Sequence, residues 1–224
     1  MANRKVPFVN GEYYHIYNRG IDKRNIFSNQ NDLGRFLRSM VEFNTIKPIG
    51  SIYENSFNQL GGSTSKLKKR KKKLVNFIAY CLNPNHYHLI IEQISEKGIE
   101  KFMHRLGTGY TMYFNEKEKR SGSLFQGRFK SIHIDSNEYI LHLSAYVNLN
   151  YRVHQLGGST SKLVKSQSSW GEYTGEKDNN ICNKGIVLGQ FADKKEYAKF
   201  SDGTVRNIIS KRYELSEIEN LLLE

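Results

Sequence analysis

Residues 74–93 decide the fold, and they read LVNFIAYCLNPNHYHLIIEQ. Leu74 to Cys81 is a run of β-branched, aromatic and apolar residues, which favours a strand. The triplet Asn83-Pro84-Asn85 is typical of a turn, and residues 86–93 form a second strand-like run. The sequence therefore predicts an antiparallel β-hairpin over this stretch.

Further elements are predicted on both sides of the hairpin from the spacing of apolar residues. Asn18-Arg19-Gly20 predicts a bend after an aromatic first strand, and Ser136 is a suitable N-cap. Gly107 and Gly109 are unfavourable inside a helix. The expected elements are strands over 13–18 and 125–135 and helices over 31–45, 98–119, 137–151 and 205–224. This order favours an α+β fold, with helices packed mainly on one face of an antiparallel sheet.

The composition favours a polyanionic partner. The chain of 224 residues has a formal net charge of +12, and residues 66–73 hold seven basic side chains in eight. Nucleic acid is the first candidate and an anionic membrane the second, although such a run is also typical of a solvated loop. The two cysteines show no metal-type spacing, and we find neither a membrane-length apolar stretch nor a signal-peptide core. We therefore expect a cytoplasmic protein with reduced thiols.

A nine-residue segment, QLGGSTSKL, occurs twice, at residues 59–67 and 155–163. Its glycine, serine and threonine content is typical of an exposed loop, and no shared structural period surrounds the copies. We interpret both as loop insertions. The hypothesis that they derive from one repeated DNA element predicts near-identical codons, including silent positions.

His86 and His88 are separated by one residue in the predicted second strand, so both side chains lie on the same face. Two imidazoles so placed can share one divalent metal ion, if another element supplies a third ligand. The alternative is a pair of hydrogen-bonded or exposed histidines without a metal. The spacing alone leaves both interpretations open.

Tyr146 and Asn150 lie four residues apart in a predicted helix, about one turn apart on one face. A deprotonated or polarised phenol is a competent nucleophile for phosphorus, and an amide oxygen can coordinate a hard divalent metal. The alternative is that Tyr146 is a core aromatic residue. Tyr110 is a competing nucleophile, but it lies in the glycine-containing segment and has no ligand-type residue one turn later.

Several motifs occur together in a fixed order, and together they are specific. They are Tyr17-Asn18-Arg19-Gly20, Ala79-Tyr80-Cys81-Leu82-Asn83-Pro84-Asn85-His86-Tyr87-His88-Leu89, the segment SGSLFQGRFKS at 121–131, Tyr146-Val147-Asn148-Leu149-Asn150, and SSWGEY at 168–173. The set resembles the single-tyrosine HUH transposases, and more closely their REP-associated tyrosine transposase branch. The resemblance covers residues 12 to 200.

The resemblance implies a ferredoxin-like HUH nuclease domain over residues 1–154, with a basic loop insertion at 58–73, followed by the inserted repeat and a C-terminal extension over 155–224. It implies a transposase, that is, an endonuclease and strand transferase that acts on single-stranded or hairpin DNA, with repetitive palindromes as candidate substrates. His86 and His88 would hold Mg²⁺ or Mn²⁺, and Tyr146 would form a 5′-phosphotyrosine intermediate. Asn150 is the preferred third ligand and Glu92 the second choice.

The sequence departs from the family pattern in two places. Tyr151 stands where the family usually has proline, which concerns the end of the helix rather than the chemistry. The second repeat copy follows this helix, and a tail displaced by it would weaken DNA recognition or leave the protein inactive. The alternatives are a replication-initiation or mobilisation nuclease, for which 224 residues leave little room, and a non-catalytic nucleic-acid-binding regulator derived from a transposase. Both a monomer and a homodimer are compatible with the sequence.

Arg19, Arg128 and Lys130 are the expected phosphate contacts, because loops beside a site supply such cations. Ordinary surface charges are the alternative for each. Tyr110, Tyr113 and Phe129 are candidates for stacking on unpaired bases, although aromatics at helical spacing are more often core residues.

Overall fold

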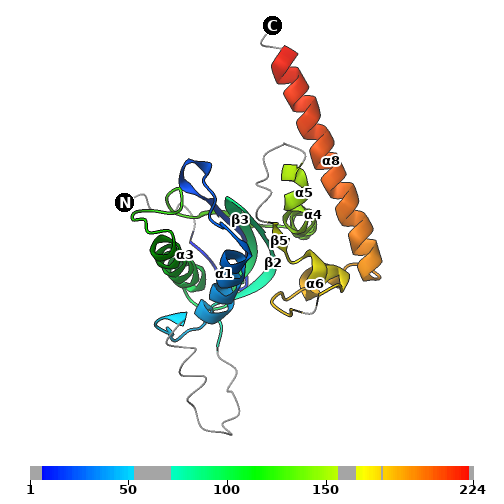
Figure 1. Ribbon diagram of the computed structural model, residues 1–224. Helices are drawn as coiled ribbons and strands as arrows, with labels where there is room; N and C mark the ends of the chain where they lie inside the picture. The colour runs from blue at the N-terminus through cyan, green and yellow to red at the C-terminus, as the bar shows by residue number, and fades with distance from the viewer. Residues whose placement is uncertain (1–6, 53–71, 156–164, 178, 222–224) are drawn as a thin grey trace.

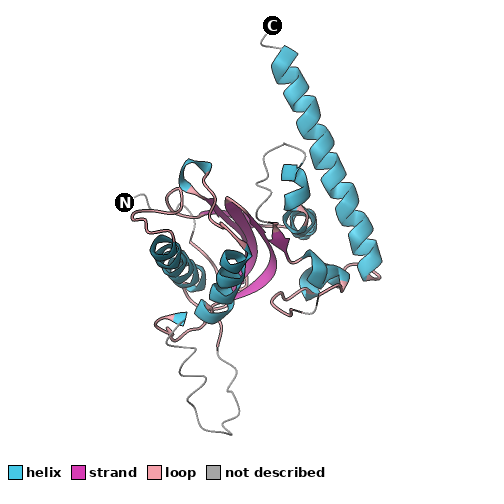
Figure 2. Cartoon of the chain, in the orientation of Figure 1, coloured by secondary structure: helices cyan, strands magenta, loops and turns pink. Residues whose placement is uncertain are grey.

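A five-stranded antiparallel sheet forms the centre of the molecule (Figures 1 and 2). The structure is a computed structural model, and it describes residues 7–52, 72–155, 165–177 and 179–221. The strand order is β4-β1-β3-β2-β5. The strands are β1 (Tyr13–Arg19), β2 (Val75–Asn83), β3 (His86–Gln93), β4 (Lys130–Ile134) and β5 (Gln167–Ser168).

The predicted hairpin over residues 74–93 is confirmed. Asn83 pairs with His86 and Cys81 with His88, so the turn consists of Pro84 and Asn85. The carbonyl of Pro84 accepts hydrogen bonds from the backbone N–H groups of Ile26 and Phe27, at 2.7 and 3.0 Å. The bend after β1 therefore packs onto the turn and holds the end of the hairpin in place.

The bend depends on Gly20. A Cβ atom at this position would lie 2.2 Å from the carbonyl oxygen of Arg24, which no side chain tolerates. The backbone N–H of Gly20 also donates to the carbonyl of Asn85 at 2.8 Å. The glycine thus allows the chain to turn into η1 (Ile21–Lys23) while remaining in contact with the hairpin turn.

Helices cover both faces of the sheet (Figure 1). Two helices, α1 (Gln30–Phe43) and α3 (Gly98–Lys117), pack on one face. The opposite face carries α4 (Asn137–Asn148), α5 (Asn150–Gln155), α6 (Trp170–Thr174), α7 (Gly185–Leu188) and α8 (Lys194–Leu221). The α+β class with an antiparallel sheet is confirmed. The placement of helices mainly on one face is wrong, because β2 and β3 are buried on both sides.

The helix over 31–45 is confirmed as α1, which begins one residue earlier. Asn29 is its N-cap and forms a capping box with Asp32. The helix over 98–119 is confirmed as α3. Gly109 is tolerated there because its missing Cβ would lie 2.8 Å from the ring of Phe43, so the glycine permits the close packing of α1 against α3.

Three predicted boundaries are wrong. The strand over 125–135 shortens to β4, because residues 125–129 form a loop tied to β1 through a hydrogen bond from Asn18 to the carbonyl of Gly127. The helix over 137–151 is interrupted at Leu149, where φ is −110° and ψ is 14°. The last helix begins at Lys194 instead of Val205, since Tyr197 and Val205 pack in the second and third cores.

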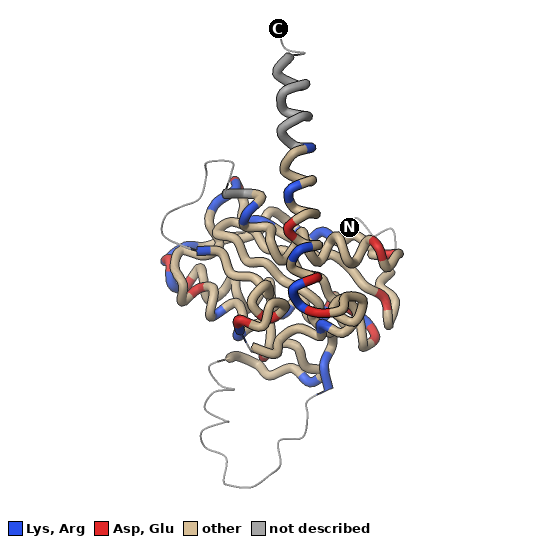
Figure 3. The backbone as a smooth tube through the Cα atoms, turned by 90° about the vertical axis from the view of Figure 1, so that its right-hand side faces the viewer, with Lys and Arg blue, Asp and Glu red and all other residues tan. Residues whose placement is uncertain are grey.

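Some sequence-based predictions fall outside the described residues, namely the first repeat copy, most of the second and most of the basic run at 66–73. Within the described part, cationic and acidic positions alternate along the first turns of α8 (Figure 3). None of the helices in the described ranges is long and apolar enough to span a membrane. The division at residue 154 stays a prediction.

Candidate active site

Two rows of paired residues cross the sheet at one end of the hairpin. His88 pairs with Tyr17 on β1, and Tyr17 pairs with Lys130 on β4. His86 pairs with Arg19 on β1 and with Asn83 on β2. Directly paired residues share a face of the sheet, so His86 lies beside Arg19, and Tyr17 lies between His88 and Lys130.

The side chain of His86 is held by three amide groups. Its Nδ1 lies 2.6 Å from Oδ1 of Asn85, and the Nδ2 of Asn85 donates to the carbonyl of Lys23, which fixes the orientation of that amide. Its Nε2 lies 2.9 Å from Nδ2 of Asn83 and 3.3 Å from Oδ1 of Asn150. Because Asn85 presents an oxygen, Nδ1 of His86 carries the proton and Nε2 carries the lone pair.

His88 contacts a second buried histidine. Its Nδ1 lies 2.9 Å from Nε2 of His15, and the two rings are stacked with centroids 5.1 Å apart. Burial lowers the pKa of His15 to about 4, so this imidazole is neutral near pH 7. The ring of Tyr17 stacks on His88 from the same strand as His15.

The nucleophile candidate Tyr146 lies on α4, and its ring packs edge-on against His88 with centroids 5.8 Å apart. Ser136 caps this helix as predicted, accepting a hydrogen bond from the N–H of Tyr139. The other end of α4 is tied down by Asn148, whose amide contacts the hydroxyls of Ser169 and Tyr197. These buried contacts hold Tyr146 against the histidine pair.

Asn150 reaches the site although α4 ends before it. The break at Leu149 starts α5, and the fully buried Asn150 accepts a hydrogen bond from Nδ2 of Asn83 at 2.7 Å. Its own Nδ2 has no hydrogen-bond partner among the described residues. The structure therefore brings Tyr146 to His88 and Asn150 to His86.

The donor set fits a divalent cation. His86 Nε2 and Asn150 Oδ1 both present lone pairs at 3.3 Å from each other, and the Asn83 amide donates to both. Imidazole nitrogen and amide oxygen suit several divalent ions. The described residues contain no group of three His, Cys, Asp or Glu side chains that could hold a metal ion.

Two rival candidates lie elsewhere. Glu92 accepts a hydrogen bond from Asn76 at the far end of the hairpin, four residue pairs beyond His88. Tyr110 is fully buried in the first core, its hydroxyl donates to the carbonyl of Ile26, and burial raises its pKa. Tyr110 is thus a core residue, and stacking on bases by it is excluded.

The other two candidates for stacking on bases also have partners within the protein. Tyr113 donates a hydrogen bond to Asp32, and the ring of Phe129 stacks on Phe8.

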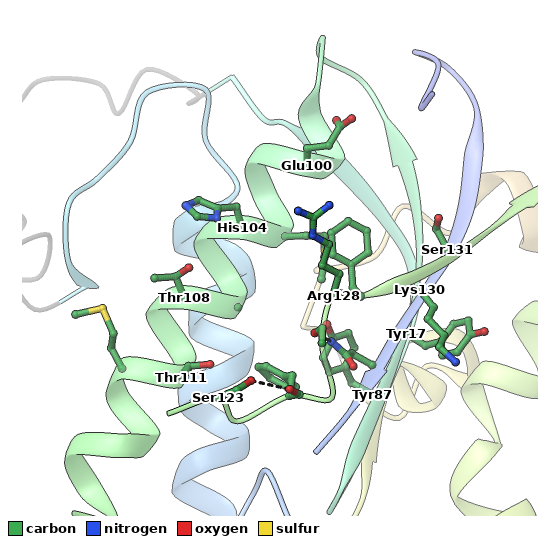
Figure 4. Close-up of a pocket in the computed structure, with 17 residues that line it drawn as sticks. Tyr17, Tyr87, Glu100, His104, Thr108, Thr111, Ser123, Arg128, Lys130 and Ser131 are labelled. Atoms are coloured by element: carbon green, nitrogen blue, oxygen red, sulfur yellow. Dashed lines mark hydrogen bonds between the residues drawn. The ribbon is translucent and has the colours of Figure 1, made fainter. Parts of the chain in front are cut away.

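The three predicted phosphate contacts separate into two groups. Arg19 and Lys130 belong to the rows that contain His86 and His88, whereas Arg128 lines a groove on the α3 side, which Lys130 also borders (Figure 4). The groove has a volume of about 1070 Å³ and is lined by α3 and the 123–131 segment. In Figure 4, Arg128 lies beside His104 and Glu100, while Lys130 and Tyr17 extend to the other side of the strands.

Sequence reasoning missed His15 and Asn83. His15 shares a face of β1 with Tyr13 and Tyr17, which was predictable, but its contact with His88 depends on which strand pairs with β3. Asn83 was assigned only to the turn. An asparagine that directly precedes the turn and pairs with His86 is a usable signal once the hairpin register is known.

Comparisons with known proteins show what the chain resembles. Residues 60–150, which include the hairpin and α4, match the family model for IS200-like transposases. The resemblance to tyrosine transposases is confirmed. A solved structure described as a REP-associated tyrosine transposase bound to a REP hairpin matches this chain with a TM-score of 0.52 and 10% sequence identity. The match covers 82% of this chain and 98% of that one, and at this identity the likeness to the tyrosine transposase shows a shared fold. No curated protein matches the chain.

Proposed function

We propose that this tyrosine-transposase-like protein is a metal-dependent endonuclease and strand transferase that cuts single-stranded or hairpin DNA through a 5′-phosphotyrosine intermediate. The observation that carries the proposal is the meeting of Tyr146, His88, His86 and Asn150 on one face of the sheet. Each contributes a group that phosphodiester cleavage requires: a nucleophile or a metal ligand.

His86, His88 and Asn150 would hold Mg²⁺ or Mn²⁺. The bound ion would polarise the scissile phosphate and stabilise the charge that develops on its oxygens. The residues of the chain perform the remaining tasks. The amides of Asn85 and Asn83 orient His86, and the contacts of Asn148 with Ser169 and Tyr197 hold α4.

In the chemical step, the phenolic oxygen of Tyr146 attacks phosphorus and forms a new O–P bond. The bond between phosphorus and the 3′ oxygen breaks, and its electron pair stays on the departing oxygen. That oxygen takes up a proton, while the phenolic proton passes to solvent. The reverse reaction, with another 3′-hydroxyl as nucleophile, releases Tyr146 and joins two DNA ends.

DNA is the proposed partner because cations flank the site and the groove. Arg19 and Lys130 lie in the rows of paired residues that contain the histidines, and Arg128 lines the groove on the α3 side. Tyr17 and Lys130 belong to the row that contains His88 and also line the groove, so the site and the groove adjoin at these two residues. The similar solved protein is bound to a REP hairpin, which supports hairpin-bearing DNA as the substrate class.

The test is cleavage of a labelled single strand that carries a hairpin, with Mg²⁺ or Mn²⁺. We expect a covalent protein–DNA adduct that survives denaturing electrophoresis and is absent when the metal is chelated. Hairpin binding without cleavage or adduct would instead support a non-catalytic DNA-binding protein. The DNA that flanks the gene is the first source of candidate hairpins.

A further inference from the structure

His15 lies behind the histidine pair, outside the set of proposed ligands and nucleophile. It is buried on β1, with 6% of its surface exposed, and its Nε2 contacts Nδ1 of His88 at 2.9 Å. The rings of His15 and Tyr17 each stack on the ring of His88, at interplanar angles of 20° and 22°. Of the two facing nitrogens, one must carry a proton and donate it in a hydrogen bond while the other accepts, because two lone pairs or two N–H groups would repel.

His86 provides an internal comparison. Asn85 offers an acceptor to its Nδ1, which leaves the lone pair of His86 on Nε2, within reach of Asn150. For His88 to join the same ion, its lone pair must also be on the nitrogen that does not face the neighbouring strand. That nitrogen is Nε2, because Nδ1 faces His15.

We propose that His15 is a positioning residue. Its Nε2 accepts a hydrogen bond from the Nδ1–H group of His88, which leaves the lone pair of His88 on Nε2 for metal binding. The inference rests on the proposed function. It assigns to His15 the role that the Asn85 oxygen has toward His86. Partners of this kind orient a ligand ring and raise its basicity, and their loss commonly reduces metal affinity about 10- to 100-fold.

The placement of His15 follows from the sheet register. Tyr17 is the direct partner of His88, so His15 is the diagonal neighbour on the same face of β1. The pairing of β1 with both β3 and β4 makes β1 an internal strand, which limits movement of His15. The hydrogen bond is therefore part of the rigid sheet and forms before any ligand arrives.

The first test needs no metal and no activity. Long-range ¹H–¹⁵N spectra of the metal-free full chain near pH 7 report which nitrogen of each histidine is protonated. We expect His88 to carry its proton on Nδ1. A spectrum with the proton on Nε2 of His88 would overturn the proposal, whatever the behaviour of any variant.

The second test compares His15→Leu with His15→Gln, because a glutamine oxygen can accept the same proton and leucine cannot. Calorimetric Mn²⁺ binding without DNA should weaken about 10- to 100-fold in His15→Leu and recover most of that loss in His15→Gln. His133→Gln is the matched control, since His133 lies on the neighbouring β4 and contacts Glu12 instead of the site. Its Mn²⁺ affinity should equal that of the unmodified protein.

The outcomes separate this inference from the function on which it rests. If the unmodified protein fails to bind Mn²⁺, the proposed metal dependence fails. If it binds Mn²⁺ and His15→Leu binds equally well, only the role of His15 fails. Should His15→Leu not fold, as judged by circular dichroism, the spectrum of the unmodified protein and the His15→Gln affinity still decide the question.

Discussion

The Oδ1 atom of Asn150 lies 3.3 Å from Nε2 of His86, and the amide nitrogen of Asn83 is within hydrogen-bond distance of both atoms. Two acceptors at this separation need a positive group between or beside them. In the metal-free protein the Asn83 amide supplies it. Under the proposed function, a divalent cation bound there would take over this role from Asn83.

Replacing Asn150 tests its role as a metal ligand. Asn150→Leu should reduce Mn²⁺ affinity at least about tenfold, because it removes the amide oxygen that lies 3.3 Å from His86 Nε2. Asn150→Asp should keep the affinity, since a carboxylate oxygen accepts from Asn83 and binds divalent ions. Calorimetry measures both. Glu92→Gln is the control; if it weakens binding and Asn150→Leu does not, Glu92 is the ligand instead.

Replacing Tyr146 tests the nucleophile. Tyr146→Phe should abolish the covalent DNA adduct while hairpin binding and the thermal midpoint remain, because the ring that packs on His88 is kept. Tyr110→Phe is the matched control. It removes a buried hydrogen bond to Ile26 and should cost about 1–3 kcal/mol of unfolding free energy, yet it should still form the adduct. Adduct formation by Tyr146→Phe would exclude Tyr146 as nucleophile.

Replacing Lys130 tests the DNA contact beside the site. Removal of one phosphate contact lowers the slope of log affinity against log salt by about 0.7 for single strands. We expect that change in Lys130→Ala, measured by fluorescence anisotropy at several salt concentrations. Lys195→Ala, an exposed lysine on α8, should leave the slope unchanged. Equal slopes for the two variants would mean that Lys130 contributes to the net charge of the protein but makes no phosphate contact of its own.

Two glycines of α3 should respond in opposite directions to the same substitution. Gly109→Ala places a methyl group 2.8 Å from the Phe43 ring and should destabilise the fold by about 1–3 kcal/mol. A methyl group at Gly107 meets no atom within 4 Å, so Gly107→Ala should stabilise the helix by about 0.5–1 kcal/mol. Chemical denaturation measures both. A stable Gly109→Ala would show that α1 and α3 can move apart without cost.

The hairpin was predictable because every determinant is local. Strand propensity, a two-residue turn and the two-residue period of side-chain direction place His86 and His88 on one face without reference to the rest of the chain. The shared face of Tyr146 and Asn150 was predicted from an unbroken helix. The helix breaks at Leu149, and Asn150 reaches His86 through its contact with Asn83 instead.

The sequence by itself determined the antiparallel hairpin, the common face of the histidine pair and the family resemblance. Only the tertiary structure decided that β1 lies beside β3, which places His15 behind His88 and Arg19 beside His86. It also decided that helices cover both faces and that Tyr110 is buried while Tyr146 meets the histidines. The physical reason is the range of the interactions. Strand propensity and side-chain alternation act between neighbours in the chain, whereas strand order and core packing depend on residues that are distant in sequence.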